Sequence, residues 1–212
     1  LNIYKGEPES MKQIELAQAV FDSGVPFFGS CWGLQVASVA AGGTGVRSIA
    51  VEVDLSFDDG FALRFVVDGE IGAVVLPQGD GELVIADSGT DGLWQGTCFE
   101  AFLTEEGQPD YTEFNYAPDG RWACYQFDDY RSLLSSDDLA PWKMEVERAP
   151  GRYAMRIEPG IFPDTGSKLA LSAVIEEVDG TKSYWALRHP PGKPDFHHPD
   201  CFALTLEARG RA

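Results

Sequence analysis

A chain of 212 residues with 44% hydrophobic residues is large enough to bury a core and to form one or two domains. Its formal net charge of −18 excludes a nucleic-acid partner, because affinity for a phosphate backbone depends on Lys and Arg. The charge also disfavours anionic lipid surfaces, and no apolar run reaches the roughly 20 residues that span a membrane.

The start of the chain and its cysteines bear on the compartment in which it works. The chain opens with Leu1 and lacks a basic stretch followed by an apolar one, so we expect no signal peptide and a true N-terminus that lies upstream. The 4 cysteines form no C-x-x-C pair, and most lie in apolar, strand-like runs that are typical of buried thiols. We therefore predict a cytoplasmic protein.

The first segment of the chain has a helical period. Apolar side chains recur at three- and four-residue steps over residues 8–23, which predicts an amphipathic helix that ends at Gly24. The apolar run 25–28 predicts a buried strand, and residues 34–41 predict a second helix. We therefore predict a helix–strand–helix fragment of α/β type at residues 1–46.

Beyond residue 46 apolar and polar residues alternate, which predicts β-strands. Asp-Gly and Pro-Gly turn signals separate the runs and favour antiparallel connections. The chain is thus expected to be mainly β, with an antiparallel β-sandwich over residues 47–212. The expected strands are 49–53, 61–67, 83–86, 97–103, 111–116, 122–127, 144–147, 153–157, 169–175, 184–187 and 202–206.

The string GSCWGLQ at residues 29–35 joins the predicted strand to the second helix. It resembles the G-x-C-x-G-x-Q motif of class I glutamine amidotransferases. In such a nucleophile elbow, small residues allow a tight turn, and a helix N-terminus favours the thiolate. The resemblance makes Cys31 the nucleophile, and the backbone amide of Trp32 a donor to the developing oxyanion.

The resemblance also requires a His oriented by a Glu, both from a later H-x-E segment. The chain offers His197 and His198 instead, followed by Pro199-Asp200 in a stretch that belongs to the β region. We therefore predict an inactive remnant in which Cys31 is vestigial. The alternative is a glutamine-hydrolysing enzyme in which His197 or His198 serves as the base.

Two further strings carry a second resemblance: LWQGTCFEAFL at 93–103 and YTEFNYAPDGRW at 111–122. They resemble the DOMON and family 9 carbohydrate-binding superfamily. The block YWALRHPPGKPDFHHPDCF at 184–202 is similar to a bacterial DOMON-like subgroup, so the likeness covers about residues 50–208. The superfamily holds a sugar or a haem on one sheet face, which implies a small-molecule ligand here.

Polar residues on neighbouring predicted strands are the ligand-binding candidates. Glu113 and Asn115 share a face because side chains alternate along a strand, and Glu100 lies on the strand before them. Carboxylates and an amide suit sugar hydroxyls, and an aromatic ring would lie under the sugar. The alternative is the solvated face of a half-exposed sheet. The aromatic candidates are Trp94, Trp122 and Tyr125.

The histidines do not predict a metal site. His197 and His198 are adjacent, so on a strand they would point to opposite faces, and we expect a Pro-rich loop held by histidine hydrogen bonds. No haem motif is present, and we expect no cofactor.

We therefore predict a non-catalytic module for a carbohydrate or another small polar ligand, joined to an inactive amidotransferase remnant. A structural or interaction domain is a further alternative. The apolar helix face within residues 1–46 must be covered, by the sandwich, by a second copy of the chain or by another partner.

Overall fold

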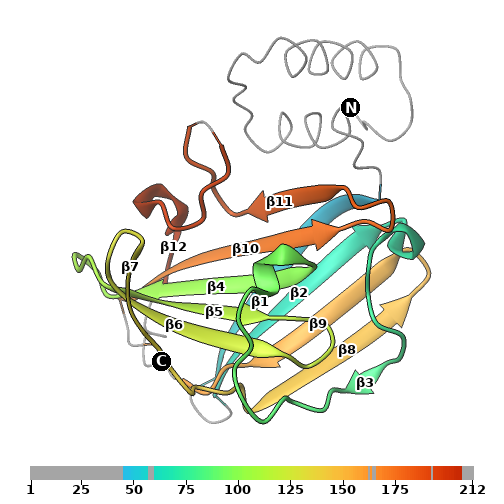
Figure 1. Ribbon diagram of the computed structural model, residues 1–212, viewed down its shortest axis with the longest axis horizontal. Coiled ribbons are helices and arrows are strands. Elements are labelled where there is room, and N and C mark those ends of the chain that lie inside the picture. The colour runs from blue at the N-terminus through green and yellow to red at the C-terminus, as the bar shows by residue number, and fades with distance from the viewer. Residues whose placement is uncertain (1–44, 57–59, 162, 164–165, 192, 207–212) are drawn as a thin grey trace, which may run out of the picture.

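The computed structural model describes residues 45–206 except 57–59, 162, 164, 165 and 192. The predicted helix–strand–helix fragment therefore lies outside the described residues, apart from its last two positions. The described part is mainly β and consists of two antiparallel sheets that face each other (Figure 1). This confirms the expected β-sandwich for this part of the chain.

The first sheet has the strand order β1-β2-β9-β8-β3. Its long hairpin pairs β1 with β2 over their whole length, and a second hairpin pairs β8 with β9. Gly151 occupies the tip of the second hairpin with φ of +73°, a conformation that glycine adopts without steric cost. The strands are β1 (Val46–Ser56), β2 (Gly60–Gly69), β3 (Gly81–Glu82), β8 (Lys143–Ala149) and β9 (Arg152–Glu158).

The second sheet has the order β11-β10-β4-β5-β6-β7, and β12 pairs with β10 beside it. The strands are β4 (Cys98–Thr104), β5 (Tyr111–Tyr116), β6 (Trp122–Asp129), β7 (Ser132–Ser136), β10 (Lys168–Glu176), β11 (Lys182–Ala186) and β12 (Leu204–Thr205). Three short 3-10 helices complete the described elements: η2 (Ile71–Ala73), η3 (Leu93–Gln95) and η4 (Pro199–Cys201).

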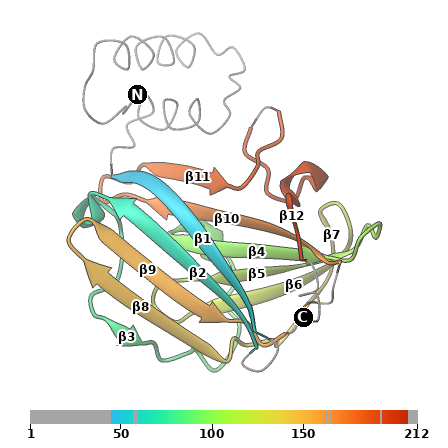
Figure 2. The same ribbon diagram turned by 180° about the vertical axis from the view of Figure 1, so that it is seen from behind.

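The main core lies between the two sheets, which Figure 2 shows from behind. Phe65 of β2 packs against Phe99 of β4 with ring centroids 5.0 Å apart, so the contact joins the two layers. Phe114, Tyr116 and Trp122 continue the same inner face across β5 and β6. Alternation along each strand then directs the residues between them to the outer face of the second sheet.

The outer face of the second sheet is also buried in part. A second hydrophobic cluster includes Phe102, Tyr111 and Phe127, and it is covered by the segment between β11 and β12. His197 of that segment packs edge-on against the rings of Phe102 and Phe127, with ring centroids 5.3 and 5.1 Å apart, respectively. This covering segment, residues 187–203, leaves room for a site between itself and the sheet.

The observed strands differ from the predicted ones in two regions. The run 83–86 is not a strand; only Gly81–Glu82 pairs with β8, and Leu83 and Ile85 pack against the core without a regular ladder. The alternation of apolar residues in this run therefore indicates side chains that pack on the core, and it does not indicate pairing with a neighbouring strand. Conversely, β7 was not predicted, because all five of its residues are exposed and show no alternation of burial.

None of the helices in the described part of the chain is long and apolar enough to cross a membrane.

Candidate ligand-binding site

The register of the second sheet brings the polar candidates together on its outer face. Ser172 of β10 lies opposite Glu100 of β4, which lies opposite Asn115 of β5. In the next row Glu113 of β5 lies between Phe102 and Tyr125. Glu113 and Asn115 share one face, as their two-residue spacing predicted, and the register of β4 adds Glu100 to that face.

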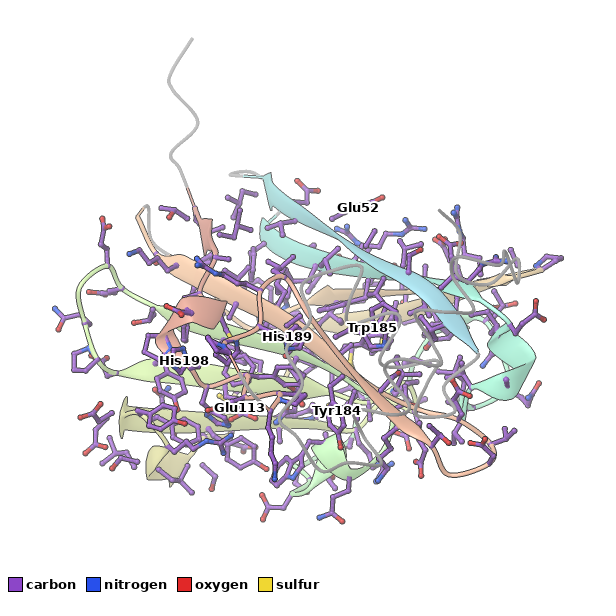
Figure 3. All side chains as sticks on the ribbon, turned by 90° about the horizontal axis from the view of Figure 1, so that it is seen from above. Glu52, Glu113, Tyr184, Trp185, His189 and His198 are labelled. Carbon is purple, nitrogen blue, oxygen red and sulfur yellow. The ribbon has the colours of Figure 1, made fainter. Side chains whose placement is uncertain are left out.

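A cavity of about 400 Å³ lies over these rows. Glu100 and Glu113 contribute to its lining from the sheet, and Trp94 and Tyr184, which are 45% and 41% exposed, line it from η3 and β11. Figure 3 labels Glu113 and Tyr184 together with His189 and His198 of the covering segment. The remaining lining residues are Phe102, Tyr125, Phe127, Arg131, Leu133, Val174, Pro194, Asp195, Phe196 and His197.

Glu100 is a buried carboxyl with a single hydrogen-bond donor. Its side chain is 2% exposed, and Ser172 Oγ donates to Oε2 at 2.9 Å. Among the described residues nothing donates to its other oxygen, Oε1. Burial, and then the nearby carboxyl of Glu113, raise the pKa of Glu100 to about 8.

Glu113 is similarly buried and is 5% exposed. Asn115 Nδ2 donates to its Oε1 at 2.7 Å. Its Oε2 lies 3.6 Å from His197 Nε2, which is beyond hydrogen-bond range. Burial raises the pKa of Glu113 to about 7, although the Asn115 hydrogen bond and the charge of Arg131 act in the opposite direction.

His197 is held as a neutral imidazole above Glu113. The backbone N–H of Arg131 donates to Tyr111 Oη at 3.1 Å, and Tyr111 Oη lies 2.8 Å from His197 Nδ1. The hydroxyl donates to Nδ1 if the imidazole proton is on Nε2, and it accepts from Nδ1 in the other tautomer. Burial, and then the charge of Arg131, lower the pKa of His197 to about 4.

Arg131 fastens the covering segment to the sheet. Its Nη2 binds Asp195 Oδ1 at 2.7 Å, and Tyr130 Oη donates to Asp195 Oδ2 at 2.5 Å. Arg131 also has a φ of +54°, which is costly for a residue with a side chain. The β6–β7 turn is thus held in a strained conformation that presents Arg131 to the segment.

Trp122 corrects one expectation, because it does not line the cavity. It lies on the inner face, is 1% exposed, and its Nε1 donates to the backbone oxygen of Ala86 at 2.9 Å. Tyr125, three residues later, is on the outer face, where its hydroxyl donates to Asp91 at 2.8 Å. The alternation of the strand separates the two aromatic candidates.

The remaining predicted residues are placed as follows. His198 does not line the cavity: its Nδ1 accepts from the backbone N–H of Asp200 at 3.1 Å and caps η4. The expectation that histidine hydrogen bonds order the loop is thus confirmed for His197 and His198. Cys31 and Trp32 lie outside the described residues. Within the described part, no three His, Cys, Asp or Glu side chains are grouped to hold a metal ion.

Sequence reasoning missed several lining residues. Phe102 could have been found, because it lies two residues after Glu100 on the same predicted strand and therefore shares its face. Arg131, Asp195 and Phe196 lie in turns and in the covering segment, where no periodicity exists to reveal a face.

Comparison with known proteins gives two matches, and no family model matches the chain. A curated protein from a Pseudomonas species, gamma-glutamyl-L-1-hydroxyisopropylamide hydrolase, is 57% identical over 42 residues near the N-terminus, which is 20% of this chain and 14% of that protein. The solved structure of a Bacteroides uniformis protein, described as a "putative carbohydrate-binding protein", covers 66% of this chain and 70% of its own with 14% identity and a TM-score of 0.38. The first match is short and the second is weak, so neither assigns the chain to a family.

Proposed function

We propose that residues 47–212 form a non-catalytic binding module for a small polar ligand of the carbohydrate class, and that residues 1–46 are an amidotransferase remnant. The observation that carries the proposal is the state of two carboxyls, those of Glu100 and Glu113. They line the cavity from the outer face of the second sheet, and we call this side of the cavity its floor. Two buried carboxyls each present an oxygen that lacks a donor among the described residues. Both carboxyls line the cavity, where the hydroxyls of a polar ligand can donate to these oxygens.

The size and lining of the cavity support this ligand class. A volume of about 400 Å³ lies within the range of roughly 300–1,000 Å³ typical of small-molecule sites. The polar floor suits ligand hydroxyls, which donate to carboxylate oxygens. Trp94 and Tyr184 at the rim provide exposed rings on which the apolar face of a sugar can stack.

Binding can be tested with saccharides and matched variants. We expect thermal stabilisation by at least one member of a panel of mono- and oligosaccharides, and a loss of affinity of at least about tenfold in Trp94→Ala and Glu113→Gln, measured by calorimetry. The matched controls are Trp142→Ala, an exposed Trp at 55%, and Glu177→Gln, a buried Glu at 4%; neither lines the cavity. Equal losses in the controls would place the ligand elsewhere, and no binding at all would favour an interaction domain.

We propose as a second candidate that Cys31 hydrolyses a γ-glutamyl amide. The short match to a γ-glutamyl amide hydrolase favours it, and glutamine is itself a γ-glutamyl amide. The Cys31 thiolate would attack the amide carbonyl, the amine would leave with a proton, and water would cleave the thioester to release glutamate.

The second candidate has its own assay. Full-length protein incubated with glutamine and with a γ-glutamyl alkylamide should release glutamate, and Cys31→Ala should abolish the release. Cys98→Ala is the matched control, because Cys98 is a buried thiol of β4. Glutamate release that persists in Cys31→Ala, or no release from either substrate, would contradict hydrolysis by Cys31.

A further inference from the structure

The charge balance of the cavity says more about the ligand than its size does. Among the described residues, three acidic side chains line the cavity: Glu100, Glu113 and Asp195. Among the described lining residues the basic side chain is Arg131, whose guanidinium is bound to Asp195. These two charges cancel, and His197 is neutral at pH 7, so the floor carries an uncompensated negative charge whenever Glu100 or Glu113 is ionised.

The open oxygens of the two carboxyls belong to this floor. Glu100 Oε1 has no donor among the described residues, and Glu113 Oε2 has no donor within hydrogen-bond range. Glu100 lies opposite Asn115, and Glu113 lies two residues before Asn115 on β5, so the two carboxyls are diagonal neighbours on the same face. One ligand group with several hydrogens can therefore donate to both.

The walls of the cavity also favour a cation. Trp94 and Tyr125 pack edge to face with ring centroids 6.1 Å apart, and Tyr184 and Phe196 form a second pair at 6.3 Å. All four rings line the cavity. The face of an aromatic ring attracts an ammonium group, and the attraction is greater where water is excluded.

We infer that the ligand of this cavity carries a protonated amine, which binds between the carboxylates of Glu100 and Glu113 and beneath the aromatic rim. The inference rests on the proposed binding function and specifies its ligand: an amine-bearing polar molecule is preferred over a neutral one of the same shape. A neutral sugar cannot supply the counter-charge that the ionised forms of the two carboxyls require.

The inference predicts a direction for the pH dependence. Among the described residues, the groups that face the two carboxyls or line the cavity with them are Ser172, Asn115, His197, Arg131, Tyr125, Tyr111, Cys98 and Asp195. The pKa values of Glu113 and Glu100 are about 7 and 8 in the empty site, so a cation that requires the ionised forms must displace protons. Its affinity therefore rises as the pH increases from 6 to 8, and its binding releases protons.

The test uses pairs of probes with the same shape and different charge. Ethanolamine is compared with ethane-1,2-diol, and 1-aminopropan-2-ol with propane-1,2-diol, by calorimetry on the full-length protein at pH 6 and pH 8. We expect at least one cation to bind ten or more times tighter than its neutral partner at pH 8, and to lose about tenfold in affinity at pH 6. The same titration in buffers of different ionisation enthalpy should show proton release.

Two variants test whether the preference for the cation depends on Glu100. Glu100→Gln should reduce the preference for the cation severalfold, whereas the buried control Glu177→Gln should retain it. A saccharide that binds while no cation exceeds its neutral partner would overturn the amine inference and leave the binding function standing. Failure of every saccharide and every amine to bind would overturn both. A cation preference that Glu100→Gln leaves intact would also overturn the inference.

Discussion

Glu100→Gln is expected to stabilise the protein at pH 8.5 and to have little effect at pH 5. The pKa of Glu100 is about 8 in the folded protein and near 4.5 in the unfolded chain, so the folded state binds more protons between these values. The contribution of this carboxyl to stability is present below about pH 4.5 and is lost as the pH rises toward 8. Glutamine resembles the protonated carboxyl and does not titrate, so the variant avoids this loss.

The expected size of the effect follows from the shift. One pKa unit corresponds to about 1.4 kcal/mol, and roughly three units of the shift lie between pH 5 and 8.5. The free energy of unfolding of the natural protein should therefore fall over this range by roughly 4 kcal/mol more than that of Glu100→Gln. Urea unfolding followed by circular dichroism at both pH values measures this difference.

The control for this prediction is again a buried glutamate outside the cavity. Glu177 is 4% exposed, and its Oε1 accepts from the backbone N–H of Gly45 at 2.9 Å. Glu177→Gln measures what the loss of a buried carboxyl outside the cavity does to the free energy of unfolding at each pH, and the effect of Glu100→Gln is compared with it. A Glu100→Gln variant that is less stable than the natural protein at pH 8.5 would mean that Glu100 is ionised and paired in the folded state.

His197 also makes the stability of the protein depend on pH, in the direction opposite to that of Glu100. Its pKa is lowered to about 4, so the folded state binds fewer protons than the unfolded chain below pH 6.5. Stability from this residue is present above pH 6.5 and is lost as the pH falls toward 4. Burial of a neutral imidazole next to two protonated carboxyls thus makes the empty site most compatible with mildly acidic pH, and occupancy by a cation would shift that optimum upward.

The sequence predicted the polar floor because a strand has a fixed period. Once β5 was recognised in YTEFNY, Glu113 and Asn115 had to share a face, and the structure places them there. The alternation of side chains along the strand does not show whether that face of the sheet is exposed to solvent or buried. The interpretation of a solvated sheet face fails for Glu100 and Glu113, because the segment 187–203 covers them.

The covering segment could not be predicted in place, since its position depends on contacts between distant residues. Asp195 reaches Arg131, and His197 reaches Tyr111, across 64 and 86 positions of the sequence. These contacts have no local signature. The same holds for Arg131, whose positive φ is a property of the β6–β7 turn rather than of its residue type.

Trp122 was a ligand-binding candidate because it is aromatic, but residue type alone does not show on which face of the sheet a side chain lies. Its replacement gives the second large expected effect, which is a loss of stability. Trp122→Ala should lower the free energy of unfolding by roughly 3–5 kcal/mol, because it removes a fully buried ring from the core and leaves the oxygen of Ala86 without its donor. Trp94→Ala removes a ring that is 45% exposed, so it should cost less than about 1 kcal/mol.

A comparison of variants at the two tryptophans therefore distinguishes an effect on stability from an effect on ligand binding. Trp122→Phe keeps most of the packing and should recover part of the lost stability. At a temperature where both alanine variants remain folded, the affinity of Trp122→Ala for a ligand of the cavity should stay within about threefold of the natural protein, while that of Trp94→Ala falls at least about tenfold. Loss of affinity in a folded Trp122→Ala would mean that the ligand lies between the sheets. Because the residues of β6 alternate between the two faces, Trp122 and Tyr125 cannot both reach one ligand on the outer face.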